Sequence, residues 1–171
     1  MKTYKLKDIF GFSVNVEEQG HNFYEKVTDC TGDKRIKKLF DYLGKQEVEH
    51  AKVFLKFHHL YSKGDTSIEA GDELIDVLDV VIRGLIFPDI SEVRDSLAKE
   101  EGLVNVLKIA MEVELNSIIF YQKVKDLIKS KQAKQALGKI INEEESHLVK
   151  LKDLRMDFDP LYAGLKYGKF F

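Results

Sequence analysis

Apolar residues recur at steps of three and four over most of the chain, which is the spacing of one face of an α-helix, whereas alternation with a period of two is hard to find. In the first segment this stripe starts at Leu6 and continues to Thr28, and Cys30–Asp33 then indicates a turn. Only two prolines, Pro88 and Pro160, are present to interrupt long helices. The pattern predicts an all-α protein whose long helices lie at about residues 6–29, 34–61, 103–129 and 132–155.

Residues 63–102 connect the second and third of these helices. Thr66–Glu69 fits a capping box, a connecting helix is predicted at about Asp72–Phe87, and Ser91 is a candidate cap for another short helix. The last residues form an aromatic tail that we expect to dock on the rest of the chain. No low-complexity linker is present, so we expect a single domain over residues 1–171. Its parts are a hairpin at about 6–61, a crossover at 63–102, a second hairpin at 103–155 and a tail at 156–171.

The first hairpin is repeated in the second at a constant shift of 97 positions. The segment VEEQGHNFYEKV matches VELNSIIFYQKV, a Glu-x-x-His motif follows in each copy, and the intervening turns match in length without a gap. The matched polar pairs are Glu17 with Glu114, Tyr24 with Tyr121, Glu47 with Glu144, and His50 with His147. A duplicated helical hairpin predicts a four-helix bundle.

The four repeated glutamates are predicted to lie at one level of this bundle. Each is about 15 residues from its hairpin turn, or about 22 Å along a helix. Because residues equidistant from a turn face each other on antiparallel helices, one glutamate from each helix can reach a common layer. The two histidines follow one helical turn later on the same face.

Four carboxylates inside a bundle cannot all remain charged and unpaired, because burying even one ion costs several kcal/mol. Either some of them are protonated or cations bind, and two divalent cations would balance four negative charges. One Glu from each of two helices, with Glu-x-x-His from each of the other two, is the ligand pattern of dimetal-carboxylate bundles. The mixed oxygen and imidazole donors suit iron or manganese better than a closed zinc site.

The paired motifs resemble those of the ferritin-like superfamily, and most closely the rubrerythrin-like di-iron proteins, over about Leu6–Tyr61 and Leu103–Arg155. The resemblance implies a ferritin-like four-helix bundle and a non-haem di-iron oxidoreductase that reacts with O2 or H2O2 using external electrons. The implied metal ligands are Glu17, Glu47, His50, Glu114, Glu144 and His147. Glu17 and Glu114 resemble terminal or bridging carboxylates. The expected cofactor is two iron ions, with manganese, or zinc as an adventitious occupant, as alternatives.

Two departures from that family change the expectation. Peroxide-reducing rubrerythrins carry an extra Glu one turn before the ligand of the third bundle helix, and the corresponding residue here is Met111. The ligand exchange linked to peroxide reduction is therefore in question. Full-length rubrerythrins also carry a rubredoxin-like module with Cys-x-x-Cys pairs, which this sequence lacks, so electrons would come from a separate donor protein.

Other residues near the predicted layer could have either of two roles, one at the metal site and one in the ordinary core. Tyr24 and Tyr121 lie seven residues after their Glu and lean back toward it, so each is either a hydrogen-bond donor to a ligand carboxylate, with a role in proton or radical transfer, or an ordinary core tyrosine. His21 shares a face with Glu17, but its repeat partner is Ile118, which favours a core or supporting histidine over a ligand. Most of the glutamates beside the predicted ligands are expected to be solvated; these neighbours are Glu18, Glu49, Glu112, Glu143 and Glu145.

Composition and charge exclude several other classes of function. A net charge of −2 gives no electrostatic case for binding nucleic acid. The single cysteine, Cys30, excludes an intrachain disulfide, and the apolar stretch 74–87 is too short and too charged to span a bilayer. With no secretory signal evident, a cytoplasmic protein is expected, as a homodimer or small homo-oligomer. Two other functions stay open: an iron-storage subunit of a ferritin-like shell, and a redox-inactive metal-binding bundle.

Overall fold

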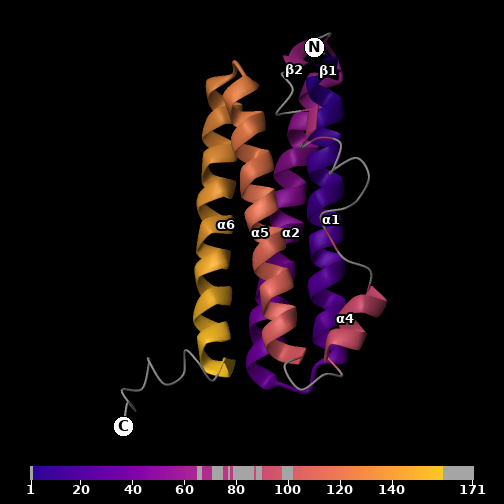
Figure 1. The fold of residues 1–171 in the computed structure, drawn as a ribbon. Coiled ribbons are helices and arrows are strands. Elements are labelled where there is room, and N and C mark those ends of the chain that lie inside the picture. Colours follow the sequence, from indigo (N-terminus) through magenta and orange to yellow (C-terminus); the bar gives the residue numbers. More distant parts are fainter. Residues whose placement is uncertain are drawn as a thin grey trace.

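Two helical hairpins pack together in the computed structural model and form a four-helix bundle (Figure 1). The first hairpin consists of α1 (Leu6–Cys30) and α2 (Lys34–Tyr61), and the second of α5 (Gly102–Leu127) and α6 (Lys131–Phe158). The structure describes residues 2–64, 67–70, 75–76, 78, 87, 90–97 and 102–159. The predicted all-α four-helix bundle is confirmed, and the ends of its four helices lie within three residues of the predicted ones.

The helix ends preserve the internal repeat. Lys131 begins α6 at 97 positions after Lys34 begins α2, and Phe158 ends α6 at the same shift from Tyr61. The residues before the two helices are both caps: Asp33 accepts hydrogen bonds from the backbone N–H groups of Arg35 and Ile36, and the Ser130 hydroxyl accepts from that of Ala133. Such a cap is worth about 1 kcal/mol relative to alanine. The same local signal therefore starts the second helix of each hairpin.

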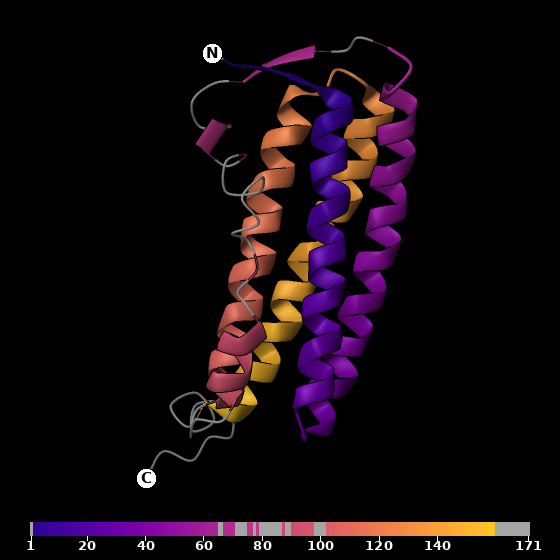
Figure 2. The same ribbon diagram turned by 90° about the vertical axis from the view of Figure 1, so that its right-hand side faces the viewer.

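The two hairpins run in opposite directions, with their turns at opposite ends of the bundle (Figure 1, Figure 2). The repeated glutamates nevertheless meet, because each lies near the midpoint of its helix: Glu17 in α1, Glu47 in α2, Glu114 in α5 and Glu144 in α6. If one hairpin is turned end over end, the midpoint of each of its helices stays at the same height along the bundle. The two hairpins are therefore related by an approximate two-fold axis that passes through the glutamate layer.

Two apolar clusters fill the bundle on either side of this layer. The first includes Phe10, which stacks on Phe57 with ring centroids 5.3 Å apart, and the second includes Phe23 and Phe40. Burying each such ring contributes about 1.5–3 kcal/mol to folding. Because both clusters are dry, the charged layer between them lies in a medium of low dielectric constant.

Short elements lie at the ends of the bundle. β1 (Lys2–Lys5) pairs antiparallel with β2 (Ser67–Ala70) beside the start of α1, and α4 (Ile90–Leu97) packs against α1 and α5. The strands were not predicted, because four residues are too few to show a period of two. The capping box at Thr66–Glu69 is wrong, since Ser67–Ala70 form β2, and Ser91 is the second residue of α4.

Most of the predicted connecting helix at 72–87 and the aromatic tail after residue 159 lie outside the described residues. Residues 75, 76 and 78 of that helix are helical. In the part of the chain that the structure describes, no helix combines the length and the apolar character needed to cross a membrane.

Candidate metal centre

The structure brings together all six side chains that the sequence singled out, at mid-height in the bundle. They are Glu17, Glu47, His50, Glu114, Glu144 and His147, none of them more than 6% exposed. Carboxylates are almost never fully buried unless they are paired or bind a cation. The burial of four at one level therefore requires a compensating charge.

The six residues form two overlapping groups. The first consists of Glu17, Glu47, His50 and Glu144, and the second of Glu47, Glu114, Glu144 and His147. Within each group, one potential ligand atom per residue lies within 4.8 Å of all the others. Glu47 and Glu144 belong to both groups, whereas Glu17 and Glu114 belong to one each. The shift of 97 positions converts either group into the other, so the layer offers two equivalent positions that share two carboxylates.

Three buried atoms of the first group have no hydrogen-bond partner: Glu17 Oε2, His50 Nδ1 and Glu144 Oε1. His50 Nδ1 lies 3.0 Å from Glu144 Oε1 and 3.5 Å from Glu17 Oε2, but neither contact has hydrogen-bond geometry. A buried polar atom without a partner costs about 1–3 kcal/mol. A divalent cation between these atoms would satisfy all of them, so the residues fit a metal ion.

Burial and mutual repulsion disfavour the charged form of two of the acids. Burial, followed by the charges of Glu144 and Glu17, raises the pKa of Glu47 well above its usual value. Burial and the charge of Glu144 raise the pKa of Glu114 to about 8. Burial also acts to raise the pKa of Glu144, but the hydrogen bond from His147 and the close approach of His50 outweigh it and hold that pKa below the usual value.

In the two histidines, by contrast, the neighbouring carboxylates favour the charged form. Burial by itself lowers the pKa of an imidazole, but contacts with Glu144 and Glu17 raise the pKa of His50 to about 11. Glu114 and Glu144 likewise raise the pKa of His147 to about 9. Without metal, the layer therefore balances its charge with protons on both histidines and on part of the carboxylates.

Two tyrosines connect the hairpins through this layer. The Tyr24 hydroxyl on α1 donates to Glu114 Oε1 on α5, and the Tyr121 hydroxyl on α5 donates to Glu17 Oε1 on α1. Burial and the adjacent carboxylates raise the pKa of both phenols well above the usual value, which keeps them protonated donors. Each bond occupies one oxygen of its glutamate and leaves the other directed toward the layer.

Glu143 is exposed, as expected for the neighbours of the predicted ligands, and it still contributes to the layer. Its Oε2 lies 2.8 Å from Nε2 of His50 and accepts a hydrogen bond from that nitrogen. A carboxylate that holds one imidazole nitrogen protonated leaves the other available to a metal. The contact runs from α6 to α2, so only the relative placement of the hairpins reveals it. Its repeat partner is Gln46, which gives the layer one departure from two-fold symmetry.

Gly20 makes room for a ligand carboxylate. A Cβ atom at this position would lie 3.2 Å from Oε2 of Glu47, closer than ordinary contact. The sequence analysis did not single out Gly20, although a glycine in the middle of a helix, which lowers stability by about 0.5–1 kcal/mol relative to alanine, is a signal of close approach. The repeat partner is Ser117, which carries a side chain.

The remaining candidates lie outside the two groups. His21 is half-buried, and its Nδ1 donates to the backbone carbonyl of Gly44 at 3.0 Å. Met111 is half-buried and packs against the second apolar cluster. The predicted exposure of Glu18, Glu49, Glu112 and Glu145 agrees with the structure.

Comparison with known proteins gives two matches. The family model for rubrerythrin matches residues 8–155. A solved structure, described as that of a ferritin-like diiron-carboxylate protein from Thermotoga maritima, is 30% identical to this chain, and the match covers 91% of this chain and 97% of that one with a TM-score of 0.69. None of the curated proteins compared with the chain matches it.

Proposed function

The chain belongs to the rubrerythrin family, and from this premise we propose that its buried layer binds two iron ions and uses them to reduce O2 or H2O2. The observation that carries the proposal is the pair of overlapping ligand groups, which the internal repeat relates and which share Glu47 and Glu144. A similar chain of known structure is described as a diiron-carboxylate protein, which supports the choice of iron.

The proposed ligands divide between the two ions. Glu17 and His50 would hold one, Glu114 and His147 the other, and the shared Glu47 and Glu144 would contact both. Two divalent ions carry four positive charges, which would balance four glutamates and leave both histidines neutral. An iron pair held there supplies electrons to an oxidant.

The surrounding side chains prepare the ligands for this role. Tyr24 and Tyr121 fix the orientation of Glu114 and Glu17, and they offer buried hydroxyl protons near the layer. The two apolar clusters exclude water above and below it, which strengthens every electrostatic interaction inside. These contacts hold a ligand set in place before a metal arrives.

The proposed reaction depends on external electrons and not on an extra ligand. A rubredoxin-like site needs Cys-x-x-Cys pairs, and residues 1–171 hold one cysteine, Cys30, so the electrons would come from outside this ferritin-like bundle. Met111 packs against apolar side chains where peroxide-reducing rubrerythrins carry another Glu. We therefore expect the reaction to proceed without ligand exchange at that position.

The direct test is reconstitution of metal-free protein with Fe(II) without oxygen, followed by mixing with H2O2 or O2. We expect about two irons per chain and a new visible absorption band after oxidation. Iron binding without any spectral change with either oxidant would support a redox-inactive bundle. A particle mass far above that of a dimer, together with uptake of many irons per chain, would favour storage.

A further inference from the structure

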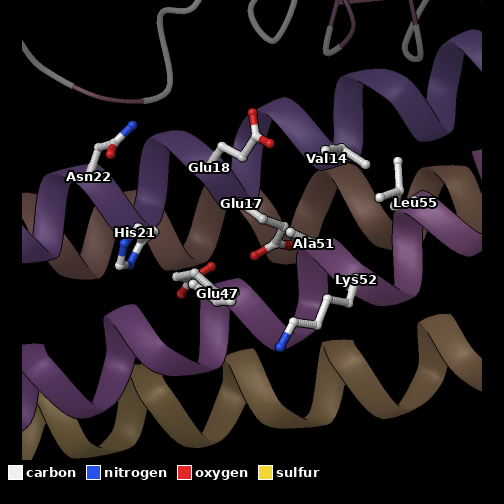
Figure 3. Close-up of a pocket in the computed structure, with 10 residues that line it drawn as sticks. Val14, Glu17, Glu18, His21, Asn22, Glu47, Ala51, Lys52 and Leu55 are labelled. Carbon is white, nitrogen blue, oxygen red and sulfur yellow. The ribbon is translucent and has the colours of Figure 1, made fainter.

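A groove between α1 and α2 opens directly onto the carboxylate layer (Figure 3). Its volume is about 420 Å³, and two of the proposed ligands, Glu17 and Glu47, contribute to its lining. Figure 3 shows these two side chains pointing toward each other between the helices, with His21 toward one end of the groove and Leu55 toward the other. The groove therefore borders two residues of the layer, which are themselves only 1% and 6% exposed.

The internal repeat provides a comparison for this groove within the same chain. Four lining residues, Glu18, Asn22, Ala51 and Lys52, correspond by the shift of 97 positions to Leu115, Ile119, Leu148 and Val149. Close to the layer, His21 and Gly44 correspond to Ile118 and Ile141, which are both buried. At these positions the α1–α2 face has smaller or more polar residues than the α5–α6 face. At Val48 and Leu55 it is the more apolar face, because the repeat partners are Glu145 and Lys152.

Gly20 and Gly44 allow neighbouring side chains on this side of the layer to approach their helices closely. Gly20 approaches the Glu47 carboxylate, and Gly44 leaves room for the imidazole of His21, whose Nδ1 would lie 3.4 Å from a Cβ placed there. His21 is held by its bond to the Gly44 carbonyl. The imidazole is therefore fixed at the border of the groove and does not fill it.

The residues that line the groove determine which ions and small molecules can enter it. Its wall includes the aliphatic Val14, Val48 and Ala51 and the charged Glu18 and Lys52. The side chains of Glu17 and Glu47 lie between the two helices. Carboxylate oxygens at this position are ligands for cations and not for anions, and they leave small neutral molecules unaffected. Divalent metal ions and uncharged oxidants such as H2O2 both meet this description.

A second groove, between α2 and α6, reaches the layer at His50 and Glu143 and not at its four glutamates. Its volume is about 780 Å³, and its lining includes His50, Glu143 and Ala136 but none of the four layer glutamates. It therefore approaches His50 from the side of Nε2, the nitrogen bonded to Glu143, and away from Nδ1. The α2–α6 groove, which is larger and ends at His50, therefore serves as a control for the α1–α2 groove, which ends at Glu17 and Glu47.

We propose that the α1–α2 groove is the route by which divalent cations and small neutral oxidants reach the metal layer. This inference rests on the proposed function, because it assigns a path to ions and substrates of that site. It also makes Ala51 a residue that sets the width of the route, since its repeat partner Leu148 is larger.

The test measures the rates of Co(II) uptake and release by the metal-free full chain, followed by visible absorption after rapid mixing. Ala51→Leu, which introduces the residue found on the opposite face, should slow both uptake and release about tenfold while leaving the number of bound ions and their affinity unchanged. Ala136→Leu, the same substitution at a half-buried position in the second groove, should leave both rates at the wild-type values. Leu55→Ala, at an exposed wall position, should increase both rates, and circular dichroism checks the fold of each variant.

A fall in affinity with unchanged uptake in Ala51→Leu would indicate a merely structural effect and would overturn the inference. Equal slowing by Ala51→Leu and Ala136→Leu, or by neither, would also overturn it. In each of these cases the wild-type protein would still bind about two ions per chain, and the proposed metal site would stand. Absence of Co(II) binding by the wild type would contradict the proposed function itself.

Discussion

Tyr24 on α1 donates its hydroxyl proton to Glu114 on α5, 90 residues away in the sequence. Tyr121 makes the equivalent bond to Glu17, so each hairpin holds a ligand of the other. The two bonds couple the packing of the hairpins to the geometry of the layer. They account for the presence of buried tyrosine, rather than phenylalanine, at both repeated positions.

Replacing Tyr24 with Phe removes this donor and leaves a buried oxygen of Glu114 without a partner. We expect the unfolding free energy of the metal-free protein to fall by about 1–3 kcal/mol, because that oxygen gains no water in exchange. Urea denaturation measures the change. Tyr42→Phe is the control, since Tyr42 is 40% exposed and should change stability by less than about 0.5 kcal/mol. Equal effects of the two substitutions would show that the Tyr24 bond contributes nothing specific.

Truncation of single glutamates should change the number of bound metals in a graded way. Glu144 belongs to both ligand groups and Glu17 to one. Glu144→Ala should therefore weaken both metal positions and leave less than about one ion per chain, whereas Glu17→Ala should leave about one. Metal analysis after gel filtration distinguishes them.

The matched control for these truncations is Glu145→Ala, because Glu145 is exposed and neighbours Glu144. It should bind as many ions as the wild type. A loss equal to that of Glu144→Ala would mean that the ligands have been assigned to the wrong positions.

Without metal, stability should decrease as the pH rises above about 5. The pKa of Glu114 is raised to about 8 from a usual 4.5, so the folded state keeps a proton that the unfolded chain loses first, and stability falls between these values. The pKa of His50 is raised to about 11 from 6.5, so its contribution is full below 6.5 and is lost as the pH rises through 11. Both effects have the same sign.

Chemical denaturation of chelator-treated protein at pH 5.5 and pH 9 measures this difference, with lower stability expected at pH 9. Metal ions should reverse the trend, because they bind deprotonated ligands and release protons, which makes the stabilisation by metal larger at higher pH. A metal-free protein that is equally stable at both values would show that the layer is not protonated as its contacts imply.

Gly20→Ala should change the stability of the metal-free protein and its affinity for metal in opposite directions. Alanine favours a helix over glycine by about 1 kcal/mol, so the metal-free protein should gain up to that amount, less the cost of displacing Glu47. Because the new methyl group displaces the Glu47 carboxylate, the affinity for metal should fall. Calorimetric titration with Co(II) and thermal unfolding give the two quantities. A rise in affinity would contradict the close approach seen here.

The level of the glutamates was predictable from the sequence, because Glu17 and Glu47 are equally distant from one turn and their repeat partners from another. The direction of one hairpin relative to the other was not predictable. Since each glutamate lies at the midpoint of its helix, parallel and antiparallel arrangements of the hairpins place it equally well. Local spacing carries no information that distinguishes them.

Contacts between hairpins were correspondingly harder to infer. The leaning of helical side chains suggested that Tyr24 approaches the layer, but its partner, a glutamate of the opposite hairpin, follows only from the packing. The contact of Glu143 with His50 was missed for the same reason, because an exposed Glu in a charged run gives no local sign of a partner. The sharing of Glu144 between two ligand groups likewise depends on the fold.

The central claim is that two metal ions occupy the mid-bundle layer, and crystallography of Fe(II)-loaded protein with anomalous diffraction at the iron edge tests it most directly. The account predicts two peaks, one among Glu17, His50 and the two shared carboxylates, and the other among Glu114, His147 and the same two carboxylates. Peaks at surface carboxylates, with the layer still closed by its own hydrogen bonds, would contradict it.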